Sequence, residues 1–103
     1  MAVPFKVDLN GKVAVVTGGG GVLCGAMAKA LAECGAAVAV ADLKLESAQR
    51  VADEITAAGG KAMAVACNAL EKASLEAANA QIEEKFGPVS ILINGAGGNH
   101  PKG

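Results

Sequence analysis

One stretch, residues 13–25, constrains the fold of this chain more than any other. It opens with Val13-Ala14-Val15-Val16-Thr17, a run of small and β-branched residues long enough for one buried strand. Four consecutive glycines, Gly18, Gly19, Gly20 and Gly21, come next. Apolar residues then recur at the spacing of one helix face, at Val22, Ala26, Met27, Ala30 and Leu31. The stretch therefore predicts a strand, a tight glycine turn and a helix.

The glycine turn also predicts an anion site. Most helices begin at a Ser, Thr, Asp or Asn whose side chain accepts hydrogen bonds from the first N–H groups, but only glycines precede this helix. A phosphate would accept those hydrogen bonds, and the helix dipole favours negative charge there. The alternative is a plain turn, which rarely needs four residues that each cost backbone entropy. We therefore interpret the turn as a phosphate site.

The rest of the chain alternates strands and helices. The first helix is expected to end near Cys34, with Gly35 as its left-handed cap. Strands are predicted at 36–41, 61–67 and 89–93, where short apolar runs occur. Between them lie two helices, each indicated by a stripe of apolar residues. The first stripe consists of Ala48, Val51, Ala52 and Ile55, and its helix ends at Gly59-Gly60. The second consists of Leu75, Ala78, Ile82 and Phe86, and its helix ends at Gly87-Pro88.

This alternation, β-α-β-α-β-α-β, predicts an α/β fold with a parallel sheet covered on both faces. Crossovers between parallel strands are right-handed, and a ligand is expected at the edge of the sheet where the glycine turn lies. Together these give the strand order 3-2-1-4. That order is one half of a Rossmann-type, dinucleotide-binding sheet plus the next strand. With 103 residues, the chain holds one domain at most.

Composition excludes several classes of function. The net charge of −1 gives no electrostatic case for a nucleic acid partner or an acidic membrane. No apolar run is long enough for a membrane span, and the N-terminus has no signal-peptide core. The three cysteines lack CxxC spacing and are interpreted as reduced, which favours a cytoplasmic protein. The single His100 cannot form a metal site alone, so no metal is expected.

Two polar residues are expected at the edge of the sheet where the glycine turn lies. Asp42 ends the second predicted strand, about twenty residues past the glycines, where dinucleotide-binding sheets place an acid that holds the ribose hydroxyls. A carboxylate there repels a 2′-phosphate, so we predict NAD in preference to NADP. Asn68 ends the third strand and could contact an adenine edge. Each residue has an alternative role as the N-cap of the next helix, and Asn68 could pair there with Glu71.

The fourth strand is followed by Asn94-Gly95-Ala96-Gly97, whose glycines permit close approach to a ligand, although a plain turn also explains them. The strict GxGxxG pattern is absent, because Cys24 takes the place of its third glycine in the register Gly19-x-Gly21-x-x-Cys24. That place requires a small residue for close packing of helix and strand. We therefore predict that Cys24→Gly raises dinucleotide affinity. A Walker A motif is also absent.

These residues resemble the short-chain dehydrogenase/reductase family. The resemblance is carried by the segment Asn10 to Gly18, by Asp42 and by Asn94-Gly95-Ala96-Gly97, which is similar to the family's Asn-Asn-Ala-Gly motif. The segments Thr17-Gly18-Gly19-Gly20-Gly21-Val22-Leu23-Cys24 and Gly97-Gly98-Asn99-His100-Pro101-Lys102 look closest to sugar-acid reductases of the D-mannonate/fructuronate type. Residues 1–103 would then form the N-terminal part of a single Rossmann domain.

The resemblance implies a cofactor site and a missing catalytic half. The family's chemistry uses a Tyr-x-x-x-Lys pair and a Ser, and this chain has no tyrosine, so it would bind NAD without catalysing hydride transfer alone. His100 and Lys102 could lie near a sugar-acid carboxylate. The residues expected to contact the cofactor are Thr17, Gly18, Gly19, Gly20, Gly21, Leu23, Asp42, Leu43, Asn68, Ala69, Asn94, Ala96 and Gly97.

Other functions stay open from the sequence. The chain could be a non-catalytic dinucleotide-binding module, a truncation without function, or part of an S-adenosylmethionine methyltransferase, against which Thr17-Gly18 and Asn94-Gly95-Ala96-Gly97 argue.

We expect the apolar fourth strand, with Val89, Ile91, Leu92 and Ile93, to leave an unpaired edge. The isolated chain should therefore self-associate, and the full-length parent is expected to be a homo-oligomer.

Overall fold

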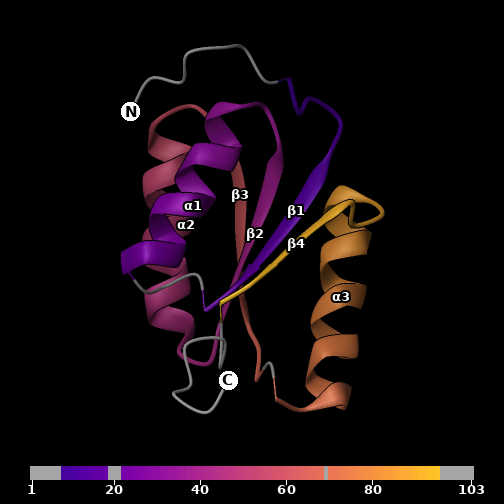
Figure 1. The fold of residues 1–103 in the computed structure, drawn as a ribbon. Helices are drawn as coiled ribbons and strands as arrows, with labels where there is room; N and C mark the ends of the chain where they lie inside the picture. Colours follow the sequence, from indigo (N-terminus) through magenta and orange to yellow (C-terminus); the bar gives the residue numbers. More distant parts are fainter. Residues whose placement is uncertain (1–7, 19–21, 69, 96–103) are drawn as a thin grey trace.

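The computed structural model of the chain describes residues 8–18, 22–68 and 70–95. Over these residues the predicted alternation is confirmed (Figure 1). The elements in chain order are β1 (Val13–Thr17), α1 (Val22–Glu33), β2 (Ala37–Asp42), α2 (Leu45–Ala57), β3 (Lys61–Ala66), α3 (Lys72–Phe86) and β4 (Ile91–Asn94).

Within the described residues, the four strands form one parallel sheet in the order β3-β2-β1-β4, as predicted. The register pairs Val13 with Ala37 between β1 and β2, and Ala37 with Lys61 between β2 and β3. On its other side β1 pairs with β4, where Thr17 lies opposite Asn94. Because all strands run the same way, their carboxyl ends meet at one edge of the sheet.

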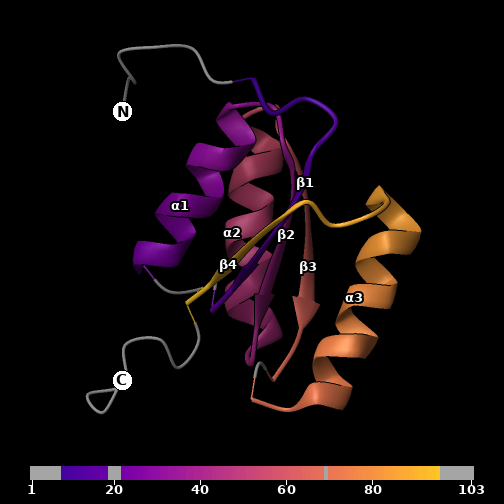
Figure 2. The same cartoon turned by 45° about the vertical axis from the view of Figure 1, so that its right-hand side comes forward.

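The sheet is covered on both faces, with α1 and α2 on one side and α3 on the other (Figure 2). Alternate side chains of each strand point to opposite faces, so the apolar strands supply two separate cores. The first core lies under α1 and α2 and includes Ala14, Val16, Val38, Val40, Val51 and Ile55. The second lies under α3 and includes Val13, Val15, Ala39, Val65, Ala78 and Ile82.

Each described helix is followed by a glycine, as the sequence predicted, and all three glycines are in the left-handed region that was predicted for Gly35. The φ angles are +105° at Gly35, +95° at Gly59 and +100° at Gly87. After α1, the Gly35 N–H donates to the carbonyl of Ala32, and after α2 the Gly60 N–H donates to that of Ile55. These bonds satisfy carbonyls that the helices leave without partners, and they turn the chain back toward the next strand.

The predicted buried face of α1 is partly wrong. Ala26, Met27 and Ala30 are exposed, while Ala28 is fully buried and Leu31 is half-buried. The helix sequence is apolar at almost every position, so the spacing of its apolar residues does not single out one face. Packing of small side chains against β1 and β2 decides the face instead.

The fourth strand begins at Ile91, two residues later than predicted, and forms an edge of the described sheet. Leu92 is 64% exposed there, whereas Ile91 and Ile93 pack against the core under α1 and α2. On the α3 side, a groove of about 330 Å³ lies between α3 and the strands, lined by apolar side chains that include Val15, Leu75 and Leu92. Part of one sheet face is therefore open.

Candidate functional site

The carboxyl edge of the sheet gathers the polar residues that the sequence singled out. Thr17 ends β1, Asp42 ends β2, Asn68 lies just beyond β3 and Asn94 ends β4. The strands are parallel and in register, so these four positions lie along one edge, from which the loops to the helices depart. Open α/β sheets bind ligands at this edge.

At the centre of the edge, Thr17 and Asn94 are joined by their side chains. The Thr17 hydroxyl donates a hydrogen bond of 2.9 Å to Oδ1 of Asn94, and its oxygen also lies 3.4 Å from the carbonyl oxygen of Ile93. Thr17 is the buried partner, and Asn94 is exposed. The bond holds the amide oxygen of Asn94 against the end of β1.

The chain leaves β1 through Gly18, in a backbone conformation that favours glycine. Gly18 has φ +70°, in the left-handed region that side chains disfavour. Helix α1 begins at Val22, so the strand, the turn and the start of the helix have the spacing that the sequence predicted. Some of the predicted site residues lie outside the described residues, namely Gly19, Gly20, Gly21, Ala69, Ala96, Gly97, His100 and Lys102.

Asp42 does not cap helix α2, because that helix has Lys44 as its N-cap residue, with no side-chain cap hydrogen bond. Instead, Oδ1 of Asp42 accepts a hydrogen bond of 3.0 Å from the N–H of Lys44, and this closes a turn directly after the strand. The carboxylate is half-buried. This hydrogen bond ties the carboxylate to its own loop, at the place where a ribose is expected.

Asn68 forms the equivalent turn after β3. Its Oδ1 accepts a hydrogen bond of 3.0 Å from Leu70 N–H, and its own N–H donates to Ser74 Oγ at 2.9 Å. The alternative pairing of Asn68 as N-cap with Glu71 as its N3 partner is wrong, because Glu71 is itself the N-cap residue of α3. The helix starts later than predicted since the turn uses three more residues.

Exposed leucines accompany the polar residues at this end of the molecule. Leu23 at the start of α1 is 75% exposed, Leu43 after β2 is 70% exposed and Leu70 after β3 is 82% exposed. The sequence pointed to Leu23 and Leu43 but not to Leu70. A large apolar residue directly after a strand-end turn is the signal that could have identified it. Together the loops place apolar side chains beside hydrogen-bonding groups at this edge of the sheet.

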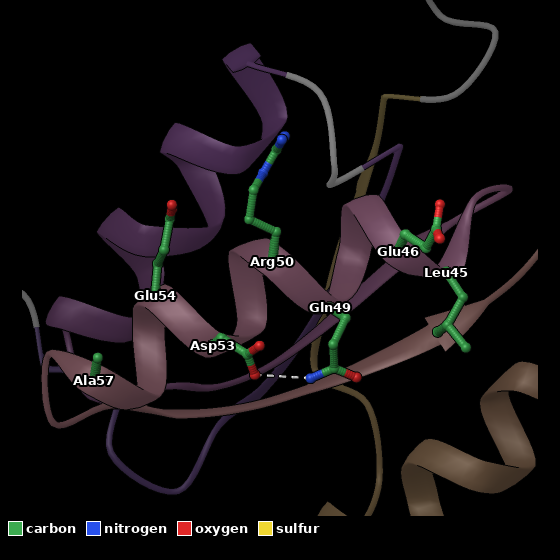
Figure 3. A pocket seen from close by; sticks show the side chains of 7 residues that line it. All are labelled: Leu45, Glu46, Gln49, Arg50, Asp53, Glu54 and Ala57. Atoms are coloured by element: carbon green, nitrogen blue, oxygen red, sulfur yellow. Dashed lines mark hydrogen bonds between the residues drawn. The ribbon is translucent and has the colours of Figure 1, made fainter.

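Another hollow, of about 670 Å³, lies along the outer surface of α2 and is lined by residues of that helix alone (Figure 3). Its side chains include Gln49, which donates a hydrogen bond to Asp53, and Glu54, which forms an ion pair with Lys29 of α1. The four polar residues at the strand ends do not line it. This hollow is therefore separate from the candidate site.

The described residues contain no group of three or more side chains suited to hold a metal ion. Nor does any helix among them have the length and apolar character that crossing a membrane requires. Both statements apply to residues 8–18, 22–68 and 70–95.

Comparison with known proteins identifies the family. The model of the family described as short chain dehydrogenase matches residues 12–103. The chain belongs to the short-chain dehydrogenases. The resemblance drawn from Thr17-Gly18, Asp42 and the motif at Asn94 is therefore confirmed. Among relatives of this short-chain dehydrogenase chain is an uncharacterized oxidoreductase, UxuB, of Bacillus subtilis, which is 54% identical over 99 residues, 96% of this chain and 36% of the relative.

A second relative of the short-chain dehydrogenase chain, 7alpha-hydroxysteroid dehydrogenase of Escherichia coli K12, is 39% identical over 97 residues, 94% of this chain and 38% of the relative. A crystal structure from Haemophilus influenza, described as a "putative D-Mannonate oxidoreductase" with bound NAD, superposes with a TM-score of 0.87 at 49% identity. The superposition covers 93% of this chain and 34% of that structure. The chain thus spans little more than a third of the length of these relatives.

Proposed function

We propose that this chain binds NAD at the carboxyl edge of its sheet, as the cofactor-binding part of an oxidoreductase. The observation that carries the proposal is the position of Asp42. Its carboxylate ends β2, beside the strand whose Thr17 and Gly18 lead toward α1, and it accepts a hydrogen bond from Lys44 N–H in the turn that follows. A ribose needs an acceptor in that position for its hydroxyls.

Other groups on the edge fit the remaining parts of a dinucleotide. The left-handed Gly18 follows β1 directly, and α1 begins at Val22, where the helix dipole favours a pyrophosphate. The exposed side chains of Leu43 and Leu70 offer apolar surface for an adenine ring. When bound, the nicotinamide would accept or donate the hydride, while these residues bind and orient the cofactor. The NAD-bound Haemophilus structure supports this choice of ligand.

The preference for NAD over NADP is tested with two matched variants. Asp42→Asn removes the charge but keeps a side-chain oxygen for the hydrogen bond from Lys44. Asp53→Asn removes a charge from the outer surface of α2 and keeps an oxygen for Gln49. We expect Asp42→Asn to lower the ratio of the NADPH dissociation constant to the NADH dissociation constant at least severalfold. Asp53→Asn should leave this ratio unchanged. Equal ratios in the two variants would refute the role of Asp42.

We also propose that residues 1–103 are the N-terminal part of one Rossmann domain, whose catalytic residues are supplied by further sequence. The absence of any tyrosine supports this, as does the share of the relatives' length that the chain covers. The test is to add the purified remainder of a close relative, such as the Bacillus protein, to this chain. Recovered NAD reduction supports the proposal. Cofactor binding without any recovery would favour a non-catalytic module.

For the complete enzyme we propose a sugar acid as substrate. The support is the 49% identity to the Haemophilus structure described as a "putative D-Mannonate oxidoreductase", compared with 39% to the hydroxysteroid dehydrogenase. A full-length protein that contains this chain should reduce NAD with D-mannonate and not with a hydroxysteroid. We further propose a cytoplasmic location and a homo-oligomeric enzyme.

A further inference from the structure

Gly95 follows β4 directly and is close to the candidate cofactor edge. Its N–H donates a hydrogen bond of 3.1 Å to the carbonyl of Thr17, which extends the pairing of β4 with β1 by one residue. Unlike the glycines that follow the helices, Gly95 does not have a positive φ. Its backbone conformation would therefore accept any residue, and the reason for glycine has to be steric.

The obstacle to a side chain at this position is Cys24. A Cβ atom placed on Gly95 would overlap Sγ of Cys24 and would lie 3.6 Å from its Cβ. The same Cβ would lie 3.0 Å from the carbonyl oxygen of Thr17, a tight contact that a shift of a few tenths of an ångström relieves. The overlap with sulfur requires a larger movement: Cys24, which is half-buried in the first turn of α1 and packs against the core, would have to rotate its side chain or shift.

We propose that Cys24 is a positioning residue: its sulfur fills the space over Gly95 and holds the start of α1 against the end of β4. Residues 24 and 95 then share one volume. With cysteine at 24, glycine is the residue that fits at 95; with glycine at 24, a side chain fits at 95. This accounts together for cysteine in the third place of the GxGxxG register and for glycine where the Asn-Asn-Ala-Gly motif has its second asparagine.

The shared volume matters for the cofactor edge, and in this respect the inference rests on the proposed function. Cys24 lies just after the predicted phosphate turn, and Gly95 follows Asn94, whose amide is fixed by Thr17. A change in the distance between α1 and β4 would move the two sides of the site relative to one another. The sulfur thus sets the separation of the two sides of the site.

A double-variant experiment on the chain tests the shared volume without any ligand. Gly95→Ala is expected to lower the folding equilibrium constant about tenfold or more in urea, the size of effect that overpacking causes. In the Cys24→Gly background the same change should cost much less. If Gly95→Ala alone yields no folded protein, recovery of folded protein in the double variant is the expected result. Equal losses in both backgrounds, or no folded double variant, would overturn the proposal.

Titration of the same proteins with NADH tests the positioning role. Cys24→Ser keeps an atom in the position of the sulfur and should retain most of the affinity, whereas Cys24→Gly should weaken binding severalfold. Tighter binding by Cys24→Gly, which the glycine motif alone predicts, would overturn the positioning role. If the unaltered chain binds no NADH but the variants still couple in urea, the proposed function fails and the shared volume stands. If the chain binds NADH but the variants do not couple, the shared volume fails and the proposed function stands.

Discussion

The hydroxyl of Thr17 donates to the side-chain oxygen of Asn94 across 77 residues of sequence, and this bond links the ends of two neighbouring strands. We expect Thr17→Val to lower the free energy of unfolding by about 1–2 kcal/mol, because it removes a partly buried donor and leaves the shape nearly unchanged. NADH affinity should also fall, since the Asn94 amide is no longer held. Urea unfolding and NADH titration measure the two effects.

The control for that variant is Thr17→Ser, which keeps the hydroxyl and loses only a methyl group. It should bind NADH nearly as well as the unaltered chain. If Thr17→Val and Thr17→Ser bind NADH equally, the hydrogen bond to Asn94 does not contribute to the site.

The ion pair between Lys29 and Glu54 should give a small pH dependence. The hydrogen bond and charge of Lys29 lower the pKa of Glu54 below its ordinary value of 4.5. A carboxyl whose pKa is lower in the folded state adds stability above its unfolded pKa, and this contribution is lost as the pH falls through the folded pKa. Urea unfolding of Glu54→Gln and the unaltered chain should therefore differ at pH 7, and the difference should shrink as the pH falls below 4.5 and Glu54 becomes protonated in the folded state.

Because both partners of that pair are exposed, added salt should reduce the difference at pH 7. Glu84→Gln, on the exposed side of α3, is the matched control because it also removes one negative charge. A Glu54→Gln difference that persists unchanged at low pH would contradict the assignment to this pair.

The edge strand should govern self-association. Leu92→Lys places a charge on the exposed side of β4, and we expect it to shift the isolated chain toward monomer in sedimentation velocity. Leu70→Lys is a suitable control because Leu70 is at least as exposed but lies in the loop after β3. A sharp monomer boundary for the unaltered chain at micromolar concentration would show that the edge does not drive association.

Two left-handed glycines offer a comparison of backbone strain with steric overlap. Gly11 and Gly35 have φ values of +84° and +105°, but a Cβ on Gly11 meets nothing within 4 Å, whereas one on Gly35 would lie 2.5 Å from Oδ1 of Asn10. Alanine should cost about 1–2 kcal/mol at Gly11 and about 1–3 kcal/mol more at Gly35. Chemical denaturation of both variants gives the difference; equal costs would mean that Asn10 moves aside freely.

The fold could be predicted from sequence because its signals are local. The helices end at Gly35, Gly59 and Gly87, and the strands between the helices are short apolar runs. The element order and the sheet topology could be predicted from these two signals. The face of α1 could not be predicted, because Ala26, Ala28 and Ala30 are alike in the sequence and only packing distinguishes them.

The site was predicted less completely than the fold. Asp42 and Asn68 were correctly expected at the ends of strands, yet their side chains close turns instead of capping helices, because two or three more residues separate each from its helix than the sequence indicated. The contact between Cys24 and Gly95 has no local signal at all. It depends on the approach of two segments that are distant in sequence, and it becomes visible only in the folded chain.

The strand order has a consequence for the kinetics of folding. Pairing of β1 with β2 and of β2 with β3 joins residues about two dozen positions apart, whereas pairing of β1 with β4 closes a loop about three times longer, at an extra entropic cost of about 1 kcal/mol. Non-local pairing is slow, so we expect β4 to dock last. Because β4 carries Asn94 and is followed by Gly95, the candidate cofactor edge would be completed only in the final step of folding.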